Sequence, residues 1–262
     1  MATSTIAETK RLPIIFFVPG AWHSPWVFDG VRSILSARGF GTETSSLATV
    51  GSADSSVGLS NDAAKVRSAL TKLIDNGKEV ILVVHSYGGV VASNAVQGLG
   101  IEQRTGNGVQ GGIVMILYLA AFAIPTKTNF LTALGGSNLP WWKISEDGFF
   151  MPIQPLDVFY ADVEATLANK AVDALRKMPL RIATDISTYD PREESFEVGY
   201  IFAEEDQALP IGAQRAMFAE FPVGSFSASL TSSHSPFLSI PDTLVDVIQR
   251  AVEHVLGKRS AK

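Results

Sequence analysis

The sequence predicts an α/β protein with a mainly parallel sheet, and three observations favour this class. Short apolar runs alternate with segments of helical periodicity along most of the 262 residues. The apolar runs are continuous, which is typical of strands that helices cover on both faces. Hydrophobic residues make up 46% of the chain and charged residues 18%, so the chain can bury a large core and is not disordered as a whole.

The first half of the chain alternates strand and helix. Continuous apolar runs indicate strands, and apolar residues at helical spacing indicate helices that Gly39 and Gly77 would end. The expected elements are, in order, a strand at Ile14–Val18, a helix at Trp26–Arg38, a weak strand at Thr42–Leu47, a helix capped by Ser60 or Asn61 and running to Asn76, a strand at Val80–Val84 and a helix at Tyr87–Val96.

The second half returns to the same alternation after a long interruption. The expected elements are strands at Gly112–Leu119, Val198–Ala203 and Phe226–Leu230, a helix at Ile211–Phe221, and a last helix that begins at Pro241 with Ser239 as its cap. Apolar residues from Leu244 to Val255 form one stripe along this last helix. We therefore expect about six mostly parallel strands flanked by helices.

Residues 126–195 break the rhythm between two strands. This interval is too long for a loop, and its glycines, prolines and paired aromatics give little strand signal, so it predicts an inserted, mainly helical cap or lid. The expected division is an N-terminal tail at 1–12, a core at 13–125 and 196–258, the cap at 126–195 and a C-terminal tail at 259–262.

Composition excludes several classes of function. The chain has no cysteine, which rules out disulfides, iron–sulfur clusters and cysteine nucleophiles. Its four histidines show no H-x-x-x-H spacing, so we expect no metal site. The net charge of -5 without a basic stretch argues against nucleic acid as a partner.

Neither a membrane span nor a dinucleotide cofactor is expected. The longest apolar run, Ile113–Ile124, is shorter than the ~20 residues that cross a bilayer, and Met1–Arg11 has no apolar signal region. We therefore expect a cytoplasmic protein. The G-x-G-x-x-G match at Gly106–Gly111 precedes a strand, whereas a dinucleotide site follows one, so we interpret it as a surface loop and expect no cofactor.

The sharpest local signal is VHSYGG at Val84–Gly89. It follows a buried strand and opens a helix, which is the context of a nucleophile elbow with Ser86 raised above the carboxyl edge of the sheet. Val84 stands where the usual G-x-S-x-G pattern has glycine. The alternative interpretation is an ordinary strand-to-helix turn.

A serine nucleophile needs a base and an acid that orients it, and both follow later strands. Asp206 comes after the strand at 198–203, and His234 comes after the strand at 226–230. We expect His254 to be solvated on the last helix, His85 to point away and His23 to lie in an early loop. Glu205 remains an alternative acid, and a loop histidine with a satisfied hydrogen bond remains an alternative reading of His234.

Further site residues come from the loop after the first strand and from the cap. The oxyanion hole of such an enzyme needs two N–H groups, for which Tyr87 and Ala21 are the candidates. Aromatic residues could form an apolar wall over the serine that binds substrate, or simply pack the cap onto the core. These aromatic candidates are Trp22, Trp141, Trp142, Phe149 and Phe159.

Four segments together resemble the α/β-hydrolase superfamily, and the likeness spans about residues 12–256. They are FFVPGAWHSPWVF, LVVHSYGG, FAEEDQALP and SSHSPFLSIP. The closer likeness is to the branch of plant methyl-ester esterases, hydroxynitrile lyases and pyrethroid-type carboxylesterases, which VFYADV in the cap also resembles. The resemblance implies a six-stranded core, no cofactor, Ser86, Asp206 and His234 as triad, and Ala21 and Tyr87 as oxyanion donors.

The sequence departs from that branch at three positions. Pro19 stands where the branch usually has histidine. The lysine and threonine of its hydroxynitrile lyases are replaced by Ser235 and Gly20, so the cation that would stabilise departing cyanide is absent.

The expected function is that of a serine carboxylesterase-like hydrolase. Its partner would be a small hydrophobic ester or lactone, with a homodimer left open. One alternative is a lyase, cyclase or isomerase of specialised metabolism that uses His234 as general base. Another is a binding protein that uses the pocket as a receptor.

Overall fold

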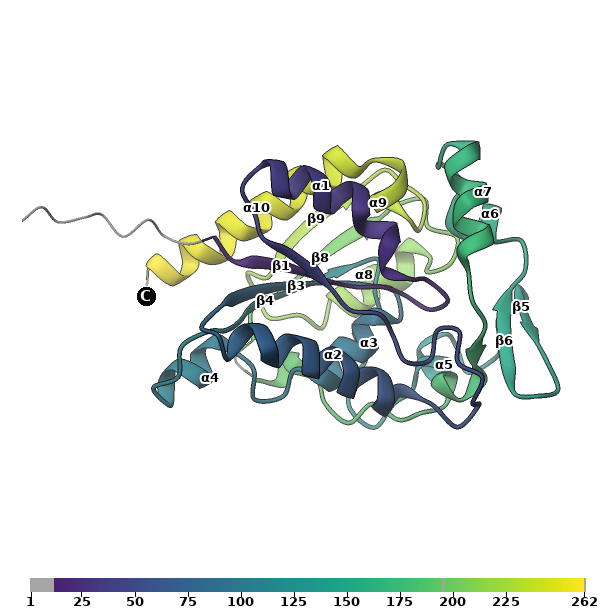
Figure 1. The fold of residues 1–262 in the computed structure, drawn as a ribbon, viewed down its shortest axis with the longest axis horizontal. Coiled ribbons are helices and arrows are strands. Elements are labelled where there is room, and N and C mark those ends of the chain that lie inside the picture. The colour runs from purple at the N-terminus through teal and green to yellow at the C-terminus, as the bar shows by residue number, and fades with distance from the viewer. Residues whose placement is uncertain (1–11, 195, 262) are drawn as a thin grey trace, which may run out of the picture.

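The computed structural model describes residues 12–194 and 196–261. At its centre is a six-stranded sheet in which every neighbouring pair is parallel, in the order β2-β1-β3-β4-β8-β9. Figure 1 shows this sheet between two layers of helices. The strands are β1 (Ile14–Val18), β2 (Thr42–Thr44), β3 (Glu79–His85), β4 (Gly112–Leu119), β8 (Val198–Ala203) and β9 (Phe226–Leu230).

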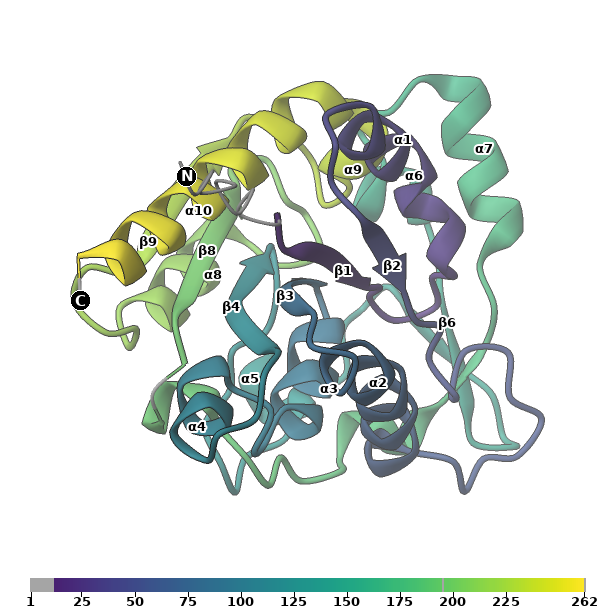
Figure 2. The same ribbon diagram turned by 60° about the vertical axis from the view of Figure 1, so that its left-hand side comes forward.

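Helices cover both faces of the sheet. In Figures 1 and 2, α1 and α10 lie on one face, and α2 and α3 lie on the other. The helices and 3-10 turns of the core are η1 (Pro25–Phe28), α1 (Asp29–Ala37), α2 (Leu59–Ile74), α3 (Gly88–Ala95), α4 (Ile101–Gly106), α8 (Ile211–Phe218), α9 (Pro236–Ser239) and α10 (Pro241–Ser260).

Alternate residues of each strand enter opposite halves of the core. Phe16 and Val18 pack with residues of α2 and α3, whereas Ile15 and Phe17 pack with residues of α1 and α10. This follows from the two-residue period of a strand, which sends successive side chains to opposite faces. Because both faces are covered, the strands need continuous apolar runs, as the sequence indicates.

The predicted fold class is confirmed, and the differences lie at element ends. The caps predicted for two helices are wrong. Gly58 precedes α2, and its N–H donates to the Asn61 side chain at 3.0 Å, so Asn61 lies inside the first turn. Ser239 ends the short α9, and Ile240 takes the cap position of α10. Helix α4 was also missed.

The region predicted as a mainly helical cap contains a sheet that the sequence analysis missed. Strands β5 (Trp142–Ile144), β6 (Phe149–Pro152) and β7 (Met178–Pro179) pair antiparallel. They are too short to show a period, and two of them end in proline. The other elements are α5 (Phe130–Ala133), α6 (Pro155–Phe159), α7 (Ala165–Ala174), η2 (Leu180–Ala183) and η3 (Pro191–Glu193).

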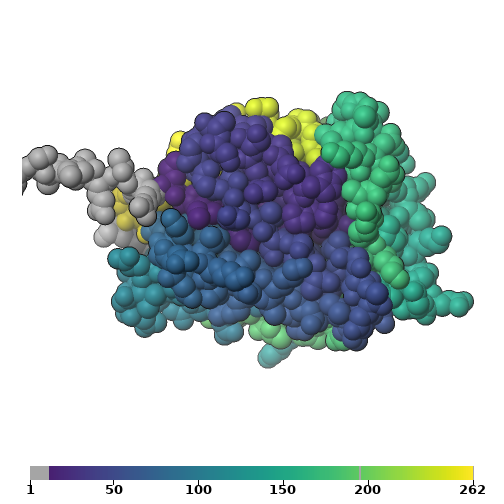
Figure 3. All heavy atoms as spheres, viewed as in Figure 1, coloured from purple at the N-terminus to yellow at the C-terminus, as the bar shows by residue number. Residues whose placement is uncertain are grey.

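On the face shown in Figure 3, the green atoms of this region pack directly against the N-terminal segments of the core. The boundaries of the cap and of the two tails stay predictions, and residues 1–11 and 262 lie outside the described residues. No helix in the described part of the chain is long and apolar enough to span a membrane.

Candidate active site

Ser86 lies on a tight turn between β3 and α3, with a φ of 53° that is strained for a residue with a side chain. The carbonyl of Ser86 accepts hydrogen bonds from Gly89 N at 3.0 Å and Phe122 N at 3.1 Å. A Cβ on Gly88 would come within 2.5 Å of the Pro19 carbonyl oxygen, so only glycine fits there. Val84 is buried within β3, and the turn forms without a glycine at that position.

The Asp206 carboxylate and the His234 imidazole meet beyond the carboxyl ends of β8 and β9. His234 Nδ1 lies 2.7 Å from Asp206 Oδ2, and both residues are buried. The other Asp206 oxygen accepts hydrogen bonds from Ala208 N at 2.7 Å and Leu209 N at 2.8 Å. Glu205, the alternative acid, is exposed. Because Nδ1–H donates to the carboxylate, Nε2 of the neutral ring is left as a proton acceptor.

His85 supports the backbone behind His234. Its ring lies 4.5 Å from the His234 ring, and its Nε2 donates to the His234 carbonyl oxygen at 2.9 Å. Burial, the proximity of His234 and that of His23 hold the pKa of His85 well below its usual value, so the ring is neutral. His254 is half-buried against Phe226, which corrects the expectation that it is solvated.

His23 joins the loop after β1 to α6. Its Nδ1–H donates to the Ala21 carbonyl oxygen at 2.6 Å, and its Nε2 accepts from the Tyr160 hydroxyl at 2.7 Å. Burial lowers the pKa of His23 to about 4, against a partly compensating hydrogen bond with Ala21. The neutral ring can therefore satisfy one donor and one acceptor at once.

The two N–H groups expected to form an oxyanion hole belong to Tyr87, which follows Ser86, and to Ala21 in the loop after β1. A Cβ on Gly20 would come within 2.8 Å of Ser86 Cβ, so the loop that carries Ala21 runs against the serine. Within residues 12–194 and 196–261, neither Ala21 N–H nor Tyr87 N–H donates to a backbone carbonyl. Both are free to donate to a bound oxygen. The Tyr87 side chain points elsewhere and donates from its hydroxyl to buried Asp62 at 3.2 Å.

A small apolar cavity joins Ser86 to His234. Its volume is about 10 Å³, which is close to the space of a single water. Three of the aromatics predicted to bind substrate, Trp22, Trp141 and Phe159, line it. The remaining wall comes from residues that the sequence analysis missed: Phe122, Phe130, Leu134, Leu139, Ala208 and Leu209. Only the position of Ala208 and Leu209 directly after Asp206 gave a signal for them.

Trp142 and Phe149 lie outside the residues that line this cavity. Trp142 packs against Phe150 with ring centroids 4.9 Å apart, and only 7% of its surface is exposed. The Phe149 ring is buried beneath the Lys177 ammonium, 3.8 Å from the ring centroid. These two side chains pack this region together, which is the alternative role considered for them.

A family model described as the alpha/beta hydrolase family matches residues 15–247. The chain belongs to this family. The expectations of an α/β-hydrolase fold and of a carboxylesterase-like hydrolase are confirmed.

Similar proteins place this alpha/beta hydrolase in the expected branch. It is 29% identical to alpha/beta hydrolase nvfD of Aspergillus novofumigatus, over 91% of this chain and 96% of the relative. It is 27% identical to methylesterase 7 of Arabidopsis thaliana, over 87% and 91% of the two chains. The structure of a pyrethroid hydrolase from Sphingobium faniae superimposes with a TM-score of 0.71 at 20% identity, over 92% and 97% of the chains.

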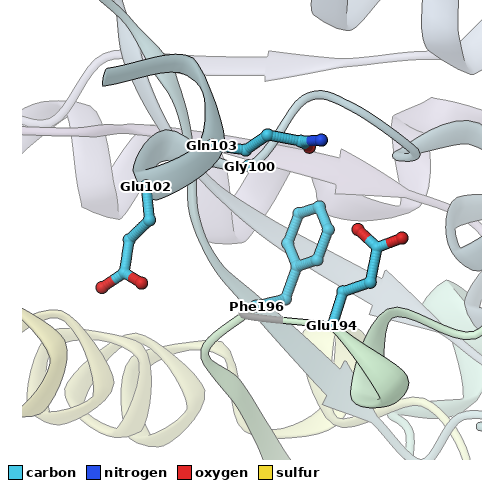
Figure 4. A pocket seen from close by; sticks show the side chains of 5 residues that line it. All are labelled: Gly100, Glu102, Gln103, Glu194 and Phe196. Carbon is cyan, nitrogen blue, oxygen red and sulfur yellow. The ribbon is translucent and has the colours of Figure 1, made fainter. Parts of the chain in front are cut away.

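This hydrolase has a second hollow, which lies near the amino ends of the strands, opposite the candidate site. It measures about 390 Å³ and lies near the start of β4, where Gly100 bridges to Ile113. Figure 4 shows the Phe196 ring between Glu102 and Glu194, with the Gln103 side chain above it. Ser86, Asp206 and His234 all follow the carboxyl ends of strands, so this hollow is separate from the candidate site. Among the described residues, no three acidic or histidine side chains gather to hold a metal ion.

Proposed function

We propose that this protein is a serine hydrolase that cleaves a carboxylic ester or lactone of a small hydrophobic molecule. One observation carries the proposal: Ser86 and His234 line the same cavity, and the far side of the His234 ring is bound to Asp206 at 2.7 Å. A nucleophile, a base and an acid that orients the base are the three parts that acyl transfer by serine requires.

The reaction would proceed through an acyl-enzyme. Ser86 Oγ attacks the substrate carbonyl while His234 Nε2 takes its proton, and Asp206 stabilises the resulting imidazolium. The Ala21 and Tyr87 N–H groups stabilise the developing oxyanion. The protonated His234 then gives its proton to the departing alkoxide. A water that His234 deprotonates attacks the acyl-enzyme, which releases the acid and restores Ser86.

The lining of the cavity supports a hydrophobic substrate. Among the described residues that line it, His234 alone carries an ionisable side chain. A charged group on the substrate would lose its hydration there without gaining a partner. The relatives named for methylesterase and pyrethroid hydrolase activity support an ester in particular.

The first test is hydrolysis of p-nitrophenyl butyrate by the wild type and by Ser86→Ala. We expect the variant to lose at least ~10³-fold in kcat because it lacks the nucleophile. Ser93→Ala is the matched control, since Ser93 lies on the adjacent helix and bonds Tyr118 at 2.9 Å, away from the cavity lining. Equal rates for wild type and Ser86→Ala would falsify the nucleophile assignment.

Two departures in sequence motivate one second candidate. Val84 and Pro19 stand where the usual elbow pattern has glycine and where the resembled branch has histidine. A lyase, cyclase or isomerase would need only His234 as general base, without an acyl-enzyme. Stoichiometric labelling of Ser86 by a fluorophosphonate would support hydrolysis, whereas an unlabelled Ser86 would support this second candidate. The cytoplasmic location and the homodimer stay predictions.

A further inference from the structure

A fully buried amide lies behind the Asp206 carboxylate, and the mechanism above does not use it. Gln214 sits on α8, and no part of it is exposed to solvent. Its Oε1 accepts from Ala203 N at 3.1 Å. Its Nε2 faces three acceptors: Leu209 O at 2.7 Å, Ala203 O at 3.0 Å and Asp206 Oδ2 at 3.3 Å.

These bonds connect the three parts of the segment that carries the acid. Ala203 is the last residue of β8, Asp206 bonds the base, and Leu209 forms part of the cavity wall. The Gln214 side chain forms hydrogen bonds with all three of these residues. Its two amide hydrogens serve three acceptors, so removing the amide would leave buried carbonyl oxygens and a carboxylate with fewer donors.

The bond to Asp206 is formed with Oδ2, the same oxygen that contacts His234. Oδ1 is already fixed by two backbone N–H groups, whereas Oδ2 has only His234 Nδ1 and Gln214 Nε2 as partners among the described residues. A second donor on Oδ2 limits rotation of the carboxylate and withdraws charge from the oxygen that faces the imidazole. The geometry of the acid therefore depends on a residue of the next helix.

We propose that Gln214 is a positioning residue that holds Asp206 Oδ2 toward His234 and sets how strongly that oxygen attracts the imidazole proton. This rests on the proposed function, because it assumes that the Asp206–His234 pair serves Ser86. It adds a fourth polar side chain to the site, one that touches no substrate and acts through the acid.

Two substitutions separate hydrogen bonding from packing. Gln214→Glu keeps the shape and an acceptor for Ala203 N–H but removes both donors and places a second carboxylate beside Asp206. Gln214→Met keeps the length and removes every polar group. Asn94→Leu is the matched control. Asn94 is a half-buried amide that bonds Val90 O at 2.8 Å and Thr188 N at 2.7 Å, away from the acid.

The deciding measurement is the pH profile of kcat/KM for ester hydrolysis. Added negative charge, or less charge withdrawn from Oδ2, favours the protonated imidazole, so a higher pH is needed to free the base. We expect the midpoint of the acid limb to rise by about one pH unit in Gln214→Glu and by less in Gln214→Met. We expect kcat to fall about tenfold in both Gln214 variants, with the KM for p-nitrophenyl butyrate little changed. In Asn94→Leu the midpoint should stay in place.

An upward midpoint in either Gln214 variant supports the proposal. A midpoint that rises in neither variant overturns it and leaves Gln214 as part of the packing alone. The ring titration of His234, followed by NMR on isotopically labelled histidine, reads the same effect without turnover. If no Ser86-dependent hydrolysis is found but this titration still moves, the proposed function fails while the coupling of Gln214 to the pair stands.

Discussion

At the scale of single residues, the candidate site contains three neighbouring histidines. The His23 and His85 rings are 6.1 Å apart, and the His85 and His234 rings are 4.5 Å apart. Burial keeps His23 and His85 neutral, which avoids placing further positive charge beside His234.

The low pKa of His23 makes the fold sensitive to acid. Its usual value is 6.5 and its value in the fold is about 4, so between these pH values the unfolded chain binds a proton that the folded protein does not. The free energy of unfolding therefore falls as the pH decreases through this range. At about 1.4 kcal/mol per pKa unit, the loss due to His23 reaches about 3 kcal/mol near pH 4.

His23→Gln keeps polar groups in the position but cannot titrate there. We expect urea unfolding to show a smaller loss of stability between pH 7 and pH 4 in this variant than in the wild type. Burial, the largest cause of the low pKa of His85, stays in the variant, so His85 still responds in the same direction in both proteins. Parallel losses in both proteins would contradict the prediction.

The principal polar residues of the site could be predicted from the sequence, but their supports could not. Asp206 and His234 each follow a recognisable strand, and neighbouring parallel strands bring their carboxyl ends together. Gln214 lies in a segment without a motif, and the VFYADV segment that contains Tyr160 indicated no role for its hydroxyl. Their partners, Asp206 and His23, are 8 and 137 residues away, and the contacts depend on side-chain direction after folding.

At the scale of elements, the start of α3 depends on the absence of side chains. A Cβ on Gly88 would lie 2.5 Å from Pro19 O and 2.8 Å from Val18 O, and backbone atoms at the end of β1 cannot easily move aside. The helix therefore approaches β1 more closely than a residue with a side chain would allow. This approach also brings Ser86 beside the loop that carries Ala21.

Gly88→Ala and Gly212→Ala form a matched pair. We expect Gly88→Ala to lower the free energy of unfolding by about 1–3 kcal/mol because the new methyl group is overpacked. Gly212 lies in α8 with nothing within 4 Å of an added Cβ, so alanine there should stabilise the helix by roughly 0.5–1 kcal/mol. Thermal or urea unfolding of both variants measures the two effects. A Gly88→Ala variant with the same free energy of unfolding as the wild type would contradict the close packing.

The elements of the core were predictable to within a few residues, whereas those between β4 and β8 were not. A strand such as β4 is eight buried residues long and carries its own signal. Strands β5 and β7 have three and two residues, and Trp142 and Met178 in these strands pack into the hydrophobic core. Local sequence patterns hold little information about such elements.

At the scale of the whole molecule, two adjacent tryptophans have different roles. Trp141 lines the cavity and is half-buried, whereas Trp142 is 7% exposed and packs between Phe130 and Phe150. The side chain that covers Ser86 and the side chain that anchors this covering are therefore neighbours in the chain. Substituting Trp141 and Trp142 one at a time therefore tests access to the site and stability of the fold separately.

Trp141→Ala should enlarge the cavity, and Trp142→Ala should destabilise the protein. For Trp141→Ala we expect the ratio of kcat/KM for p-nitrophenyl octanoate to that for the butyrate to rise about tenfold. For Trp142→Ala we expect a loss of about 3–5 kcal/mol in the free energy of unfolding, with that ratio unchanged. Kinetics on both esters and thermal unfolding check the pair. A similar response of the two variants would contradict the separate roles.

The hydrogen bond between Tyr160 and His23 has a consequence for chimeras of this protein. Tyr160 comes directly after α6, and His23 holds the carbonyl of Ala21, so the two halves of this contact belong to segments that a graft would separate. A foreign insert without a hydroxyl at position 160 would leave the imidazole with an unpaired nitrogen in an apolar setting. Such exchanges will preserve the loop beneath only when the donor segment brings an equivalent phenol.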